Sequence, residues 1–105
     1  SVYMGGCTFT GWDVGAVALD GGMIGVERCE FRQNGIGFLY RSVSFRSFND
    51  VFPDCIIADN DIGVQFALLS GNICIDFAGS VFSGNRVDVD NPINYPIDLS
   101  GALFE

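Results

Sequence analysis

The stretch formed by residues 29–38 recurs along the chain with the same order of residue types. It predicts a short strand, a sharp turn at Asn34-Gly35 and a second strand, and copies of it begin at Cys7, Cys55 and Ser80. One hydrophobic position recurs in every copy, spaced by 22, 26, 25 and 22 residues, and we call it the anchor column: Phe9, Phe31, Ile57, Phe82 and Phe104. A period in the twenties, rich in Gly, Asn and β-forming residues, is typical of a solenoid.

Aligning the anchors places hydrophobic residues at alternate positions on either side of them. Alternation of this kind predicts strands with one face turned inward. Each repeat, which we call a rung, then holds three short strands: one before the anchor, one containing it and one after the following turn. We therefore predict an all-β parallel β-helix of about four turns, with equivalent residues of successive rungs stacked in columns.

Asparagine recurs at the bend between the second and third strands, as Asn34, Asn60 and Asn85. We expect these residues to adopt the left-handed conformation, which Asn tolerates best after Gly, and to stack as a hydrogen-bonded ladder. The alternative is a row of amides that binds a ligand. Three glycines are expected next to them on the outward side of the third strand, as a bare track that Asp88 interrupts: Gly15, Gly37 and Gly63.

Three of the four cysteines, Cys7, Cys29 and Cys55, share one column. Neighbouring rungs are about 4.8 Å apart, whereas a disulfide needs Cβ atoms about 3.8 Å apart. We therefore expect buried thiols in this column, and the redox compartment stays open.

Composition limits both the organisation of the chain and its partners. The net charge is −8, with no Lys and no His, which argues against nucleic-acid binding. The apolar runs are too short to cross a membrane, so we expect no membrane insertion. Residues 1–105 are expected to be a single, partial and uncapped domain. We expect it to be a fragment of a longer solenoid, or a piece that associates end to end with a partner.

Two acidic pairs are the candidates for chemistry. Asp76 and Asp98 share an outward column of the first strand, so their Cα atoms should be about 5 Å apart on adjacent rungs. Such a pair can act as the catalytic carboxylates of a retaining glycosidase if they lie about 5–5.5 Å apart, or of an inverting one if they lie further apart, or it can bind Ca²⁺. Asp88 and Asp90 form a second outward patch that could bind Ca²⁺ or a sugar. The alternative for both is a solvated acidic face that protects exposed strands.

Aromatic and basic side chains supply the candidate binding residues. Trp12 and Tyr95 are possible platforms for sugar rings, and Tyr95, between two prolines, is expected to be the more exposed. Phe45 and Arg46 lie in the longest insertion, residues 41–49, on the side where solenoids commonly build their binding surface. The alternative is a flap that covers the core. Tyr40 is expected in the core.

The repeat resembles that of the right-handed parallel β-helix, or pectin lyase-like, superfamily. The resemblance rests on three copies of one pattern: Cys29-Phe31-Asn34, Cys55-Ile57-Asn60 and the pair Phe82-Asn85. The resemblance implies a right-handed solenoid over the whole chain. It leaves function open, because the superfamily includes polysaccharide lyases, polygalacturonases, phage tailspikes, adhesins and autotransporter passengers. The N-T-D, D-D, G-H-G and R-I-K signatures of polygalacturonase-like enzymes are absent.

Two functions remain in competition. The first is an extracellular or cell- or virion-surface segment that binds carbohydrate, as part of a polysaccharide-degrading or tailspike-like protein. The second is a structural surface solenoid, an adhesin passenger or fibre segment without catalytic activity. Whether this chain is an enzyme stays open, and Ca²⁺ is the one cofactor that the acidic pairs suggest.

Overall fold

The computed structural model describes residues 2–19, 24–43, 48–51, 54–70, 73–95 and 97–105, and these residues form strands, turns and no helix. The first strands of the rungs are β1 (Val2–Gly5), β4 (Ile24–Glu27), β7 (Phe48–Val51) and β10 (Ile73–Asp76). The second strands are β2 (Thr8–Thr10), β5 (Glu30–Arg32), β8 (Ile56–Ala58), β11 (Val81–Ser83) and β13 (Leu103–Phe104). The third strands are β3 (Val14–Leu19), β6 (Ile36–Val43), β9 (Ile62–Ser70) and β12 (Val87–Asp90).

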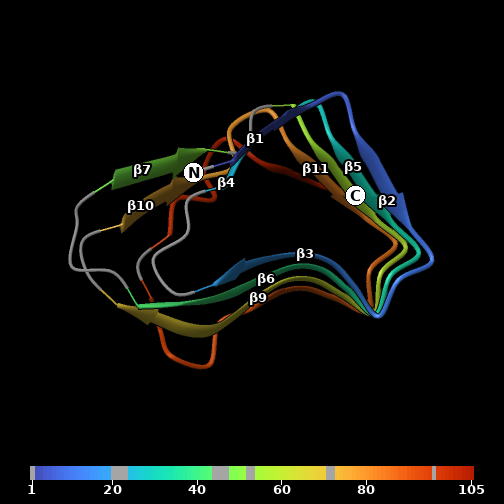
Figure 1. Cartoon of the computed structure of the whole chain (residues 1–105). Coiled ribbons are helices and arrows are strands. Elements are labelled where there is room, and N and C mark those ends of the chain that lie inside the picture. The colour runs from blue at the N-terminus through green and yellow to red at the C-terminus, as the bar shows by residue number, and fades with distance from the viewer. Residues whose placement is uncertain (1, 20–23, 44–47, 52–53, 71–72, 96) are drawn as a thin grey trace.

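Strands pair in parallel with their counterparts in neighbouring rungs. The second strands form a five-stranded sheet in the order β13-β11-β8-β5-β2, and the third strands form a four-stranded sheet in the order β12-β9-β6-β3. The groups of strands lie around a common interior (Figure 1). The prediction of an all-β fold with parallel sheets is confirmed.

The first strands differ from the single column that the sequence predicts. They form two separate two-stranded sheets, β1-β4 and β10-β7, in which Val2 pairs with Ile24 and Asp50 with Ile75. The division between β4 and β7 coincides with the longest repeat, where the insertion of residues 41–49 enters the chain.

The anchor column is in register, and Phe31, Ile57 and Phe82 are buried, whereas Phe104 at its end is 49% exposed. Phe9 pairs with Phe31, Phe31 with Ile57, Ile57 with Phe82, and Phe82 with Phe104. The Phe9 and Phe31 rings stack with centroids 5.3 Å apart, and the Phe82 and Phe104 rings stack at 5.0 Å. Tyr40 is buried and stacks on Phe66, as predicted for a core residue. Stacked like residues therefore fill the space between the sheets.

The left-handed residues at the second bend are not the asparagines, so that prediction is wrong. The residue before each asparagine position has the positive φ instead, at 78°, 56°, 58° and 68° for Gly11, Gln33, Asp59 and Gly84. This turn leaves the next residue free to direct its side chain inward. Asn34 and Asn60 are thereby buried, at 4% and 3% exposure, which removes them as ligand-binding amides.

The expected asparagine ladder is present. Asn34 Nδ2 donates to Asn60 Oδ1 at 3.2 Å, and Asn60 Nδ2 donates to Asn85 Oδ1 at 3.0 Å. Each amide also donates to the carbonyl of the anchor residue in the preceding rung: Phe9, Phe31 and Ile57. The amides therefore satisfy buried backbone groups and join neighbouring rungs.

The cysteine column holds thiols, as predicted. Cys7, Cys29 and Cys55 form no disulfide, and Cys29 and Cys55 are buried. Burial is the main cause that raises the pKa of the Cys55 thiol. The side chain of Cys74 lies outside the described part of the structure.

Candidate binding groove on the five-stranded sheet

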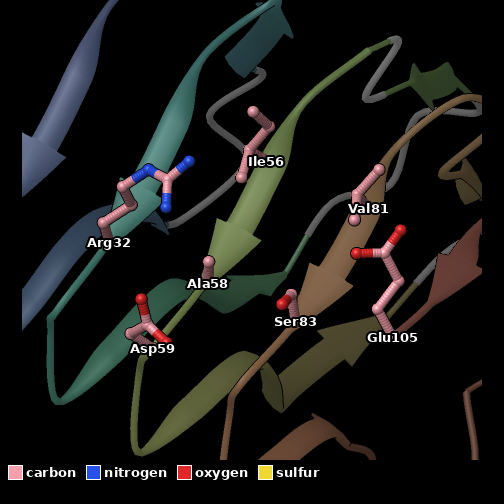
Figure 2. Close-up of a pocket in the computed structure, with 7 residues that line it drawn as sticks. All are labelled: Arg32, Ile56, Ala58, Asp59, Val81, Ser83 and Glu105. Carbon is pink, nitrogen blue, oxygen red and sulfur yellow. The ribbon is translucent and has the colours of Figure 1, made fainter.

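A shallow groove of about 290 Å³ lies on the outer face of the five-stranded sheet (Figure 2). Strands β5, β8 and β11, the turn after β8 and the residue that follows β13 contribute its lining: Arg32, Ile56, Ala58, Asp59, Val81, Ser83 and Glu105. The groove crosses several rungs, so a bound molecule would contact segments far apart in the sequence.

The alternation of strand residues explains this lining. Ile57 and Phe82 point into the core, so their neighbours on each strand point outward. The outward residues after these two anchors, Ala58 and Ser83, are small and form a low floor. Arg32 and Glu105 occupy the equivalent outward positions on flanking strands and are larger. The difference in side-chain size along one column therefore creates the depression.

Charged groups of both signs border the floor. Arg32 Nε donates to Glu30 Oε1 at 2.9 Å, with side chains 40% and 37% exposed. Its terminal guanidinium nitrogens make no hydrogen bond to a described residue, so they are available to a ligand. The exposed carboxylates of Asp59 and Glu105 add acceptors. The groove thus offers donors and acceptors beside the apolar side chains of Ile56 and Val81.

The predicted acidic pair, Asp76 and Asp98, comes together in register, since the two residues form a parallel β-bridge. Each carboxylate is engaged by the turn that follows it. Asp76 Oδ1 accepts a hydrogen bond from the Ala78 N–H at 2.9 Å. Asp98 Oδ1 accepts from the N–H and the hydroxyl of Ser100 at 2.9 and 2.6 Å, and these bonds hold the pKa of Asp98 below its usual value. A catalytic role for the pair stays a prediction.

The second predicted patch, Asp88 and Asp90, is half-buried and is bonded to neighbouring polar side chains. Asn85 Nδ2 donates to Asp88 Oδ1 at 3.0 Å, and Gln65 Nε2 donates to Asp90 Oδ2 at 2.8 Å. Asp88 is thus the last member of the asparagine ladder. Within the described ranges, no group of three or more His, Cys, Asp or Glu side chains is arranged to hold a metal ion.

The predicted aromatic platforms differ in exposure, in the opposite order to the one expected. Trp12 is 64% exposed, and its backbone N–H donates to Asn34 Oδ1 at 3.0 Å at the first rung of the ladder. Tyr95 is half-buried and packs against the core, because Asn91 holds its backbone with two hydrogen bonds. Neither residue lines the groove, and Phe45 and Arg46 lie outside the described residues.

The groove itself was missed by reasoning from sequence. Its signal lies in the columns that flank the anchors, where Thr10, Arg32, Ala58, Ser83 and Glu105 are outward equivalents. A change from large to small and back to large residues in one outward column indicates a depression.

No protein-family description, curated protein or solved structure matches the chain significantly. Among the residues that the structure describes, no helix is long and apolar enough to cross a lipid bilayer.

Proposed function

We propose that this chain is a segment of a right-handed parallel β-helix on an extracellular, cell or virion surface, and that it binds a saccharide in the groove of the five-stranded sheet. The observation that carries the proposal is the lining of the groove. A guanidinium and two carboxylates surround a small floor that includes the Ser83 hydroxyl, next to the side chains of Ile56 and Val81. Sugars present hydroxyl groups and apolar C–H faces together, and such a mixed lining complements both.

The charge of the lining favours a neutral saccharide. The lining contains one positive group, the guanidinium of Arg32, and two negative groups, the carboxylates of Asp59 and Glu105. Glu30 already accepts a hydrogen bond from Arg32. The whole chain carries a net charge of −8. A polyanionic chain such as a polyuronate would be repelled by this field, whereas a neutral oligosaccharide would not.

The size of the groove supports a short ligand segment. Its volume of about 290 Å³ lies just below the range of about 300–1,000 Å³ for small-molecule sites. A ligand of this size would contact Ala58 and Ser83 beneath it and reach Arg32 on one side and Glu105 on the other. Binding through so few groups is expected to be weak for one unit and to strengthen when sites are repeated.

A glycan array followed by calorimetric titration of the best neutral oligosaccharide tests the proposal. The variant Ser83→Phe fills the floor and is expected to weaken binding at least about tenfold. Thr10→Phe is the matched control, because Thr10 is the exposed, hydroxyl-bearing equivalent of Ser83 on β2 and lies outside the groove. An array without a bound neutral glycan, or equal binding by both variants, would contradict the proposal.

A structural role is the second candidate, and the exposed apolar residues of the last described strand favour it. Leu103 and Phe104 of β13 are 57% and 49% exposed. In this alternative the segment extends a fibre or passenger, and further strands pair on the five-stranded sheet. The substitution Phe104→Ser would then reduce self-association in size-exclusion chromatography without changing glycan binding. Unchanged elution of a self-associating chain would oppose this role.

A further inference from the structure

One column of the four-stranded sheet holds glycine in three rungs and aspartate in the fourth: Gly15, Gly37, Gly63 and Asp88. Glycine is required at positions 15, 37 and 63 because the next rung leaves no room for a Cβ atom. A Cβ atom at Gly15 would lie 2.6 Å from the carbonyl oxygen of Gly37, and one at Gly37 would lie 2.5 Å from that of Gly63. The outward bare track expected from the sequence is therefore wrong, because these positions face the next rung.

The same geometry relates Gly63 to Asp88. A Cβ atom at Gly63 would lie 2.5 Å from the carbonyl oxygen of Asp88. Position 88 repeats the position of Gly63 one rung further on. A strand that paired with β12 in the same register would bring its own carbonyl oxygen against the Cβ atom of Asp88. Backbone cannot shift away from backbone at this distance without loss of the ladder.

The carboxylate of Asp88 also takes the place of the next asparagine. In the second and third rungs, Nδ2 of each asparagine donates to the asparagine of the following rung, at 3.2 Å from Asn34 and 3.0 Å from Asn60. In the fourth rung, Asn85 Nδ2 donates to Asp88 Oδ1 at 3.0 Å. The amide donor of Asn85 is thus satisfied within its own rung.

We propose that Asp88 is a stop residue, which ends the four-stranded sheet by preventing another strand from pairing with β12 in register. The excluded partner is any segment that would pair with β12 as the next parallel strand of this sheet. The five-stranded sheet continues past this rung, because β13 pairs with β11. Association through the rungs, expected from the sequence, must therefore leave out the four-stranded sheet. An edge closed in this way resists the open-ended stacking that produces fibres.

The test compares four proteins by hydrogen–deuterium exchange of the amides of residues 87–90 at increasing concentration of a synthetic peptide with the sequence of residues 14–19, the third strand of the first rung. The peptide lacks β2, which in a whole second copy would collide with β13. Asp88→Gly restores the residue of the other three rungs, and Asp88→Ala keeps the Cβ atom but removes the carboxylate. Asp90→Gly is the matched control, with the same change of charge and residue in the same strand, in a column where Gln65 precedes it. The wild-type chain is the fourth.

Only Asp88→Gly is expected to gain protection of these amides as the peptide concentration rises, by at least about tenfold, because the peptide can then pair with β12. The wild type, Asp88→Ala and Asp90→Gly should show no concentration dependence. A folded Asp88→Gly without this gain, or an equal gain in Asp88→Ala, would overturn the proposal. If Asp88→Gly does not fold, the wild-type protein alone decides the matter. Protection of wild-type residues 87–90 at high peptide concentration would overturn the proposal, and unchanged exchange of these amides would support it.

Discussion

Asn60 is joined to Asn85 by two hydrogen bonds, since its backbone N–H and its Nδ2 donate to the same Oδ1 at 2.9 and 3.0 Å. Asn34 is joined to Asn60 in the same way, at 3.0 and 3.2 Å. The repeated pair satisfies backbone groups where the chain turns between the five-stranded and four-stranded sheets. The ladder therefore holds the register between the two sheets, and the groove depends on that register.

Replacing Asn60 with alanine is expected to destabilise the fold by about 2–4 kcal/mol, because the Phe31 carbonyl and the Asn34 N–H would lose their buried partners. Urea denaturation followed by circular dichroism measures this change. The Asn85→Ala variant should cost less, because Asn85 is half-buried and water can replace part of its hydrogen bonding. A cost below about 1 kcal/mol for Asn60→Ala would show that the ladder is not a main source of stability.

Replacing Gly37 with alanine is expected to destabilise the fold by about 1–3 kcal/mol through overpacking. The new Cβ atom would lie 2.5 Å from the Gly63 carbonyl oxygen and 3.1 Å from Asn60 Nδ2, so both the sheet and the ladder would have to move. Thermal unfolding of this variant should be compared with that of Ser83→Ala, a surface change expected to stay within about 0.5 kcal/mol of the wild type. Equal stability of the two variants would contradict the close approach between β6 and β9.

The register of the strands could be predicted from sequence because the anchor position is hydrophobic in every rung. Phe9, Phe31, Ile57, Phe82 and Phe104 need only a constant hydrophobic column to be aligned, and the pairing of Asp76 with Asp98 followed from that alignment. When repeats stack in parallel, residues one repeat apart in the sequence become neighbours in space.

The features that sequence reasoning missed depend on local backbone geometry or on insertions. The left-handed residues include Gln33, which has no preference for that conformation, so the turn dictates φ there and the residue does not. The exposure of Trp12 and the burial of Tyr95 depend on loop packing, which has no period. The groove arises from side-chain sizes in an outward column, where the hydrophobic pattern carries no information.

Cys7, which is half-buried, and Cys55, which is buried, should differ in their reactivity toward alkylating reagents. Burial raises the pKa of Cys55, so its thiolate is scarcer than usual at neutral and mildly alkaline pH, while Cys7 is only half-buried. Brief iodoacetamide treatment of the folded chain at pH 8, followed by peptide mass spectrometry, is expected to label Cys7 well before Cys55. In urea the two residues should be labelled alike. Preferential labelling of Cys55 in the folded chain would contradict its burial.

The pH dependence of stability should carry a contribution from Asp98. Its carboxylate accepts two hydrogen bonds from Ser100, and these hold its folded-state pKa below the ordinary value of 3.8. A group with a depressed folded pKa stabilises the fold above its unfolded pKa, and the contribution is lost as pH falls through the folded pKa. The Ser100→Ala variant removes the hydroxyl and keeps the backbone bond, so the pKa of Asp98 should rise part of the way to its ordinary value. Carboxyl NMR titration measures this rise, with Ser83→Ala as the control that leaves Asp98 untouched. An unchanged titration midpoint in Ser100→Ala would show that the Ser100 hydroxyl does not stabilise the Asp98 carboxylate in solution.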